Sequence, residues 1–203
     1  MWIIGHVLSG YDGSNPLPNP TALFYSIVRR FSPATIAAMF WGHTHEDQLI
    51  LYYDYLPGSL NTTTGLRNTT MVDYNSPLNA AFVGPSLVPI TNNNAGWRVY
   101  QIDAKTFSVL NHQTYFANIS NSHFWSEPVW EFEYDARATY DPLQKWGAND
   151  PLNVTFWDGV TKQMLNDPSL VNTYNFLETK VFHPVVQFSL PPNPFPLPFE
   201  MMS

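Results

Sequence analysis

The chain lacks cysteine altogether, is poor in basic residues and contains no long apolar run. A chain without cysteine suits an oxidising and a reducing compartment equally well. Nine Lys and Arg against sixteen Asp and Glu give a formal net charge of −7, which argues against a protein that binds nucleic-acid phosphates. No stretch is apolar for long enough to span a bilayer, and we find no signal peptide before the first apolar segment.

The sequence does contain enough apolar material for a packed core. Of its 203 residues, 44% are hydrophobic and 16% are aromatic. This composition is typical of a folded globular protein and not of an intrinsically disordered one. The length suits one domain or one and a half.

The segment 40–47, F-W-G-H-T-H-E-D, holds two histidines where an apolar run ends. Apolar runs at 36–41 and 49–53 flank it, and each is predicted to be a short strand. In extended backbone, residues two apart point to the same side, so His43 and His45 can share one cavity. Imidazole is a common metal ligand, but a pair of exposed loop histidines would have the same spacing.

The start of the chain repeats this layout. Residues 2–7, W-I-I-G-H-V, again give an apolar strand, a glycine and a histidine, here His6. Two strands that each end in Gly-His are typical of a sheet edge that carries a metal site. The repetition favours a metal role for these histidines over the exposed-loop alternative.

Two further stretches, A-F-V-G-P-S at 81–86 and G-W-R-V-Y-Q-I-D at 96–103, complete a wider pattern. With them, the chain resembles the acid sphingomyelinase-like phosphodiesterases of the calcineurin-like metallophosphoesterase superfamily. The resemblance runs from Trp2 to about Lys180 and matches only the C-terminal half of such an enzyme. It implies an α/β fold, namely the C-terminal part of a calcineurin-like β-sandwich flanked by helices and followed by a small helical cap.

The resemblance also implies a site with two zinc ions that hydrolyses a phosphodiester, either sphingomyelin at a membrane surface or a related lipid or nucleotide diester. By resemblance, His6 and His43 would bind one zinc ion and His45 the other. The family's remaining ligands come from D-x-H, G-D and N-H-E motifs that precede this segment, and this sequence contains none of them. We therefore expect the chain to need an N-terminal half for a complete site, and to be inactive without it.

Three further residues have a possible role at such a site. Trp97 stands where the family places an aromatic ring near the substrate head group, which would allow a cation–π contact with choline. A position in the core or at its rim is the alternative for this ring. Glu46 or Asp47 is expected either to orient an imidazole or simply to close the strand.

Asn-x-Ser/Thr sequons begin at Asn61, Asn68, Asn118 and Asn153. Combined with the resemblance, they predict a secreted or lysosomal-type glycoprotein. Two alternatives to an enzyme stay open. One is a catalytically inactive secreted glycoprotein that keeps the scaffold for binding only, and the other is a truncated gene product.

The resemblance and the composition divide the chain into three parts. Residues 1–120 would form the C-terminal half of the catalytic domain and residues 121–180 a helical sphingomyelinase-type region. Residues 181–203 are rich in proline, which prevents regular helix or central strand, so this tail is predicted to be unstructured.

Local patterns give the expected elements. They predict a helix from Asn19-Pro20 to Phe31, a surface loop from Leu56 to Ser76, a strand at 80–83 and a hairpin at 97–110. After Ser126 they predict three helices, at 129–137, 151–164 and 168–177.

Overall fold

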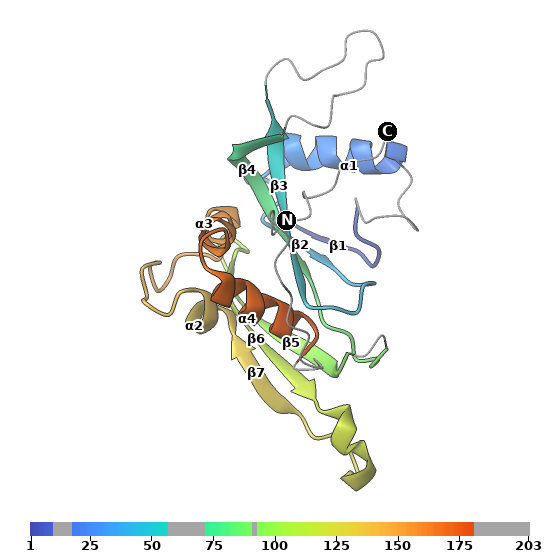
Figure 1. Ribbon diagram of the computed structural model, residues 1–203. Helices are drawn as coiled ribbons and strands as arrows, with labels where there is room; N and C mark the ends of the chain where they lie inside the picture. Colours follow the sequence, from blue (N-terminus) through green and yellow to red (C-terminus); the bar gives the residue numbers. More distant parts are fainter. Residues whose placement is uncertain (10–17, 57–71, 91–92, 181–203) are drawn as a thin grey trace.

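The computed structural model describes residues 1–9, 18–56, 72–90 and 93–180, and within them the chain is mixed α/β with two sheets (Figure 1). The strands are β1 (Trp2–Ile4), β2 (Ala38–Trp41), β3 (Gln48–Tyr55), β4 (Val72–Val83), β5 (Ala95–Ile102), β6 (Val109–Ala117) and β7 (Glu131–Asp135). The helices are α1 (Pro18–Phe31), α2 (Ala136–Tyr140), α3 (Val154–Met164) and α4 (Pro168–Glu178), with a 3₁₀ turn η1 (Ile119–Phe124).

The first sheet has the strand order β1-β2-β4-β3. Its first three strands are parallel, with Ile4 beside Phe40 and Phe40 beside Phe82. β3 runs antiparallel to β4. Because β1, β2 and β4 run in one direction, their carboxyl ends meet at the same edge of the sheet.

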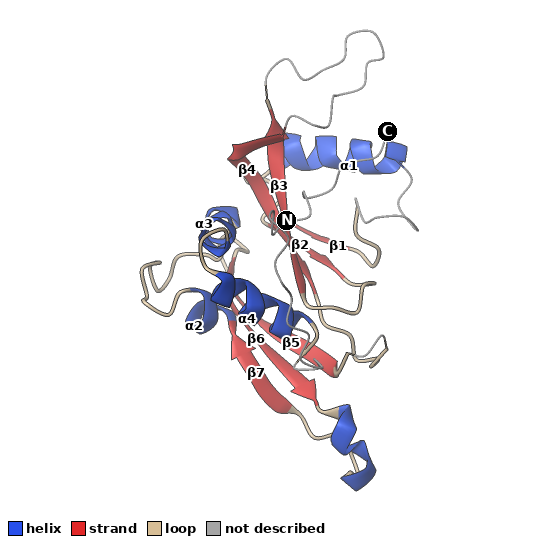
Figure 2. Cartoon of the chain, in the orientation of Figure 1, coloured by secondary structure: helices blue, strands red, loops and turns tan. Residues whose placement is uncertain are grey.

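The two faces of this sheet bury different partners. Side chains alternate along a strand, so Ala81 joins the cluster under α1 with Val28, whereas its neighbours Ala80 and Phe82 join the cluster on the other side. That second cluster includes Trp157 of α3. Helices α1 and α3 therefore lie on opposite sides of the sheet, as Figure 2 also shows.

The second sheet is antiparallel, with the order β5-β6-β7. Its inner face carries Tyr134 and Val109, which pack in the same cluster as α3 and α4. The protruding turn η1 connects β6 to the segment before β7 (Figure 1). No helix in the described ranges is long and apolar enough to cross a membrane.

Most of the predicted elements are confirmed. The strands on both sides of the histidines form as β2 and β3, and the first helix begins at Pro18, slightly earlier than expected. The last helix begins after Asp167, whose side chain accepts hydrogen bonds from the backbone N–H of Ser169 and Leu170. The helix predicted at 151–164 begins only at Val154, because Asn153 is the capping residue.

The helix predicted at 129–137 is wrong. Residues Glu131–Asp135 form strand β7, which pairs with β6, and only the short α2 follows it. Within this strand, Tyr134 is buried while Phe132, two residues earlier, is 55% exposed, because the pairing of β6 with β7 shifts register between Thr114 and Tyr115 and interrupts the alternation. The pairing with β6, and not a regular period of two in the segment itself, therefore defines it as a strand.

The predicted loop at 56–76 is also partly wrong. Strand β4 already begins at Val72 and reaches the expected segment 80–83 by way of irregular pairing with β3 near Tyr53. The predicted hairpin is confirmed, but its second strand begins at Val109 and not at Phe107, whose φ of 61° belongs to the turn.

Several predictions lie outside the described residues. These are the loop after Ser9, the sequons at Asn61 and Asn68, and the proline-rich tail from Val181.

Candidate functional site

Parallel pairing brings the two Gly-His segments together at one edge of the first sheet. His6 follows β1 and His43 follows β2, and the two strand ends are linked beyond their last paired residues. The N–H of Gly5 donates to the carbonyl of Phe40, and that of Gly42 donates to the carbonyl of His6, both at 3.0 Å. The backbone therefore delivers both imidazoles to one place.

The two imidazoles face each other. Nδ1 of His43 lies 3.4 Å from Nε2 of His6, with the ring centroids 5.2 Å apart and the rings nearly perpendicular at 79°. His6 is exposed and His43 is half-buried. The convergence predicted for this pair is present in the structure.

His45 is placed differently from the prediction. His43 and His45 have φ values of 79° and 66°, so both residues are in the left-handed region and not in extended backbone. The same-side argument from strand geometry therefore does not apply. Nδ1 of His45 is buried, and no described residue hydrogen-bonds to it. We call His6, His43 and His45 the histidine edge.

Within the described ranges, no group of three or more His, Cys, Asp or Glu side chains is arranged to hold a metal ion. The pair His6 and His43 is thus brought together, whereas a shared position for His45 is not seen. The metal role of all three residues stays a prediction.

The carboxylates after the histidines have partners on other elements of the fold. Asp47 is bound by Arg98 in an ion pair whose side chains are only 6% and 3% exposed. The hydroxyl of Tyr134 donates to the same Asp47 oxygen at 2.8 Å, and that of Thr114 lies 3.3 Å from it. We call Asp47, Arg98, Thr114 and Tyr134 the buried network. It connects the loop after β2 to the inner face of the second sheet.

Glu46 has another partner. Nε2 of Gln48 donates to Glu46 at 2.8 Å and to Glu178 of α4 at 2.9 Å. Both carboxylates are therefore held by one amide, and the predicted orienting role toward an imidazole is not seen for Glu46.

Two carboxyl groups near this loop have strongly perturbed acidities. Burial, together with the nearby negative charge of Asp47, raises the pKa of Glu133 to about 8. Burial likewise raises the pKa of Glu178 to about 7, although the hydrogen bond from Gln48 acts in the opposite direction. Both oxygens of Glu133 are buried, and no described group hydrogen-bonds to them.

A buried cation from the far end of the described chain, Lys180, contacts the loop that carries the histidines. Its side chain is fully buried, and Nζ donates to the backbone carbonyl of His45 at 2.7 Å. Burial lowers the pKa of Lys180, whereas the carboxylates of Asp47 and Glu133 raise it.

Sequence reasoning did not identify Arg98, Glu133, Glu178 or Lys180. A charge inside the apolar strand W-R-V-Y is one signal for a buried ion pair, and Arg98 carries it. Glu133 has no comparable local signal, because it lies where the pairing of β6 with β7 shifts register. Nothing in the local sequence points to Lys180, because its partner lies 135 residues earlier.

Trp97 belongs to an aromatic cluster on the outer face of the second sheet. It is half-buried and stacks on Tyr115 of β6, with ring centroids 4.6 Å apart and planes 10° apart. The ring of Trp130 meets it edge-on at 6.2 Å. Since side chains alternate along β5, Trp97 faces away from Arg98 and the buried network. Its head-group role stays a prediction.

Two sequons can be located. Asn118 is half-buried and caps η1, where its side chain accepts from the N–H of Ser120. Asn153 is exposed and caps α3, where it accepts from the N–H of Thr155 and Phe156. Whether either residue is glycosylated stays a prediction.

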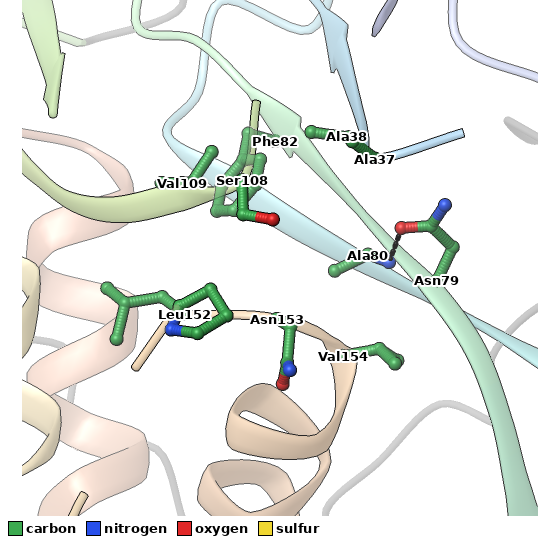
Figure 3. Close-up of a pocket in the computed structure, with 11 residues that line it drawn as sticks. Ala37, Ala38, Asn79, Ala80, Phe82, Ser108, Val109, Leu152, Asn153 and Val154 are labelled. Carbon is green, nitrogen blue, oxygen red and sulfur yellow. Dashed lines mark hydrogen bonds between the residues drawn. The ribbon is translucent and has the colours of Figure 1, made fainter. Parts of the chain in front are cut away.

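A small pocket opens between β2, β4 and the start of α3, with room for about one water molecule (Figure 3). Its wall is mostly apolar, as Ala38 and Leu152 illustrate. Asn79, which lines it, turns its side-chain oxygen toward the N–H of Ala80 at 2.8 Å. None of the histidines lines this pocket, so it is not the candidate site.

Comparison with known proteins defines the class: the chain is homologous to phosphodiesterases of the sphingomyelin phosphodiesterase type over 88% of its length, which confirms the resemblance noted in the sequence. No protein-family model matches the chain.

Three relatives illustrate the match. Human sphingomyelin phosphodiesterase is 33% identical over 183 residues, covering 88% of this chain and 25% of that protein. Sphingomyelin phosphodiesterase 2 of Caenorhabditis elegans is 36% identical over 148 residues, covering 68% of this chain and 21% of its own length. The human cyclic GMP-AMP phosphodiesterase SMPDL3A is 29% identical over 191 residues, covering 87% of this chain and 36% of that protein. The chain thus spans about a fifth to a third of the relatives that it matches.

Proposed function

We propose that this chain carries part of the active site of a metal-dependent phosphodiesterase, in which His6 and His43 bind one zinc ion and His45 contributes to a second. The observation that supports this most strongly is the convergence of His6 and His43 at the ends of two parallel strands. The homologous proteins are named for hydrolysis of sphingomyelin or cyclic GMP-AMP, and both compounds contain phosphodiester bonds.

The geometry of the pair fits zinc. Two imidazole nitrogens bound tetrahedrally, each at about 2.0–2.1 Å from zinc, lie about 3.3 Å apart. Nε2 of His6 and Nδ1 of His43 are already 3.4 Å apart. The buried Nδ1 of His45, which no described group satisfies, is a further nitrogen donor in the same loop.

A bound zinc ion supplies Lewis acidity and an ionised water molecule as nucleophile. The residues of this chain would hold it and keep its ligands oriented. Pairing of β1 with β2 fixes His6 against His43, and the ion pair of Asp47 with Arg98 anchors the loop that carries His43.

The histidine edge alone would not complete such a site. The family's other ligands belong to D-x-H, G-D and N-H-E motifs, and we propose that an N-terminal half supplies them within one calcineurin-like catalytic domain. The substrate would be sphingomyelin or a related lipid or nucleotide diester. The sequons at Asn118 and Asn153 support a secreted or lysosomal-type glycoprotein.

Zinc titration tests this proposal. Isothermal titration calorimetry of the chain should show zinc binding that weakens at least tenfold in His6→Ala and in His43→Ala. His123→Ala is the matched control, because His123 is exposed on η1 and lies outside the histidine edge. Equal affinities in all four proteins would refute the metal role.

Activity gives a second readout. The purified chain with zinc should not hydrolyse a chromogenic phosphodiester at acidic or neutral pH, because a metal without its full ligand set does not hold an open, fixed geometry. Turnover that disappears in His43→Ala would show that the chain is catalytically self-sufficient.

A further inference from the structure

The loop that carries two of the proposed ligands, His43 and His45, has a strained backbone conformation. His43 and His45 both have left-handed φ values, 79° and 66°. A residue with a Cβ atom rarely adopts this conformation, and it persists only where surrounding structure enforces it. Within the loop, the N–H of Thr44 donates to the carbonyl of Gly42 at 3.0 Å. Contacts from other elements must supply the rest of the restraint.

The C-terminal end of α4 supplies such contacts at nearby points of the loop. Nζ of Lys180 donates to the carbonyl of His45 at 2.7 Å, and Nδ2 of Asn93 makes a longer contact of 3.4 Å with the same oxygen. Two residues on, the N–H of Asp47 donates to the carbonyl of Glu178 at 2.9 Å. The carbonyl of His45 and the N–H of Asp47 are thus both held by the segment at the end of α4.

Lys180 is itself firmly placed. Its N–H donates to the carbonyl of Leu177 at 3.0 Å, and its own carbonyl accepts from Nδ2 of Asn94 at 2.8 Å. Its stem passes over Gly96, where an added Cβ atom would lie only 2.5 Å from Cδ of Lys180. Glycine at position 96 therefore makes room for this side chain.

Packing alone does not require an ammonium group here. A buried cation loses its hydration, whereas an apolar side chain of the same length would fill the space without that cost. The ammonium group of Lys180 donates to the backbone carbonyl of His45. Its use is the hydrogen bond, and the nearby carboxylate of Asp47 offsets its charge.

We propose that Lys180 is a positioning residue that fixes the carbonyl of His45 and thereby the left-handed conformation in which His43 and His45 present their imidazoles. The consequence for metal affinity rests on the proposed function, whereas the effect on the loop does not.

Lys180→Met tests the proposal in the full chain, because methionine keeps an unbranched apolar stem and removes the ammonium. Lys162→Met is the matched control, since Lys162 pairs with Asp158 on α3. In ¹⁵N-labelled protein, Lys180→Met should shift the amide resonances of 43–47 and speed hydrogen exchange of the Asp47 amide at least tenfold. Lys162→Met should leave both unchanged. Loop resonances and exchange that stay as in the wild type in Lys180→Met would overturn the proposal.

Two further readouts complete the test. If the proposed function holds, Lys180→Met should also weaken zinc binding at least tenfold; if the wild type binds no zinc, the proposed function fails while the exchange data still decide the role of Lys180. If Lys180→Met does not fold, a measurement on the wild-type chain tests the role of Lys180 instead. A scalar coupling between Nζ of Lys180 and the carbonyl carbon of His45 supports the proposal, and absence of that coupling overturns it.

Discussion

At the histidine edge, His6 is exposed and its Nε2 lies 3.4 Å from Nδ1 of His43. In the buried network, only a few residues further along the same loop, the carboxylate of Asp47 is surrounded by Arg98 and two hydroxyl donors. The first region presents one exposed imidazole, that of His6, whereas the side chains of the second are almost completely buried. The loop after β2 thus carries both His43, which lies beside the exposed His6, and Asp47, which is anchored in the interior.

The largest effect is expected when the ion pair that anchors the loop, between Asp47 and Arg98, is removed. Arg98→Met should destabilise the chain by about 3–5 kcal/mol, because Asp47 is left as a buried charge without its partner. Urea unfolding followed by circular dichroism measures this change. The control is Arg30→Met, since Arg30 is exposed on α1. An Arg98→Met variant as stable as the control would mean that the network does not anchor the loop.

The acidity of Glu133 gives a second test, of the interior region alone. Its pKa is raised to about 8 in the folded state against 4.5 in the unfolded chain, so the folded state binds the extra proton between these values. Stability from this group is complete below pH 4.5 and is lost as pH rises toward 8. We therefore expect the chain to be more stable at pH 5 than at pH 8.

Glu133→Gln should flatten this pH dependence by an amount on the order of a few kcal/mol, since one pKa unit corresponds to about 1.4 kcal/mol. Glu131→Gln, on the exposed side of the same strand, is the control and should behave like the wild type. Urea midpoints at both pH values provide the comparison. A Glu133→Gln curve as steep as that of the wild type would contradict the assignment.

A smaller effect is expected away from both regions. The hydroxyl of Tyr53 on β3 donates to buried Asp158 of α3 at 2.9 Å. Tyr53→Phe should cost about 1–2 kcal/mol, because the carboxylate loses one donor and keeps Lys162. Tyr74→Phe, at a 41% exposed position, should cost almost nothing. Equal stability of the two variants would show that this contact between sheet and helix contributes little.

The sequence predicted the parts of the site that depend on local pattern. Short apolar runs that end in Gly-His were enough to expect strands β1 and β2 and to bring His6 near His43. The left-handed backbone at His45 was not predictable, because it depends on Lys180, a partner far along the chain. Strand β7 was mistaken for helix because a five-residue segment shows too few periods to separate alternation from helical spacing.

The buried network also depends on contacts that the sequence pattern did not predict. Asp47 was visible as a carboxylate next to two histidines, and its position suggested a role toward an imidazole. Its true partner, Arg98, lies on another sheet, and only the packing of the two sheets brings the residues together. Pairings of this kind are decided by tertiary structure and not by spacing in the sequence.

Anomalous diffraction at the zinc absorption edge, from crystals of the chain soaked in zinc, tests the central claim most directly. The account predicts a peak bound by both Nε2 of His6 and Nδ1 of His43, about 2.0–2.1 Å from each, and no peak there in His43→Ala. A zinc peak on other residues, or none at the histidine edge of the wild type, would contradict it.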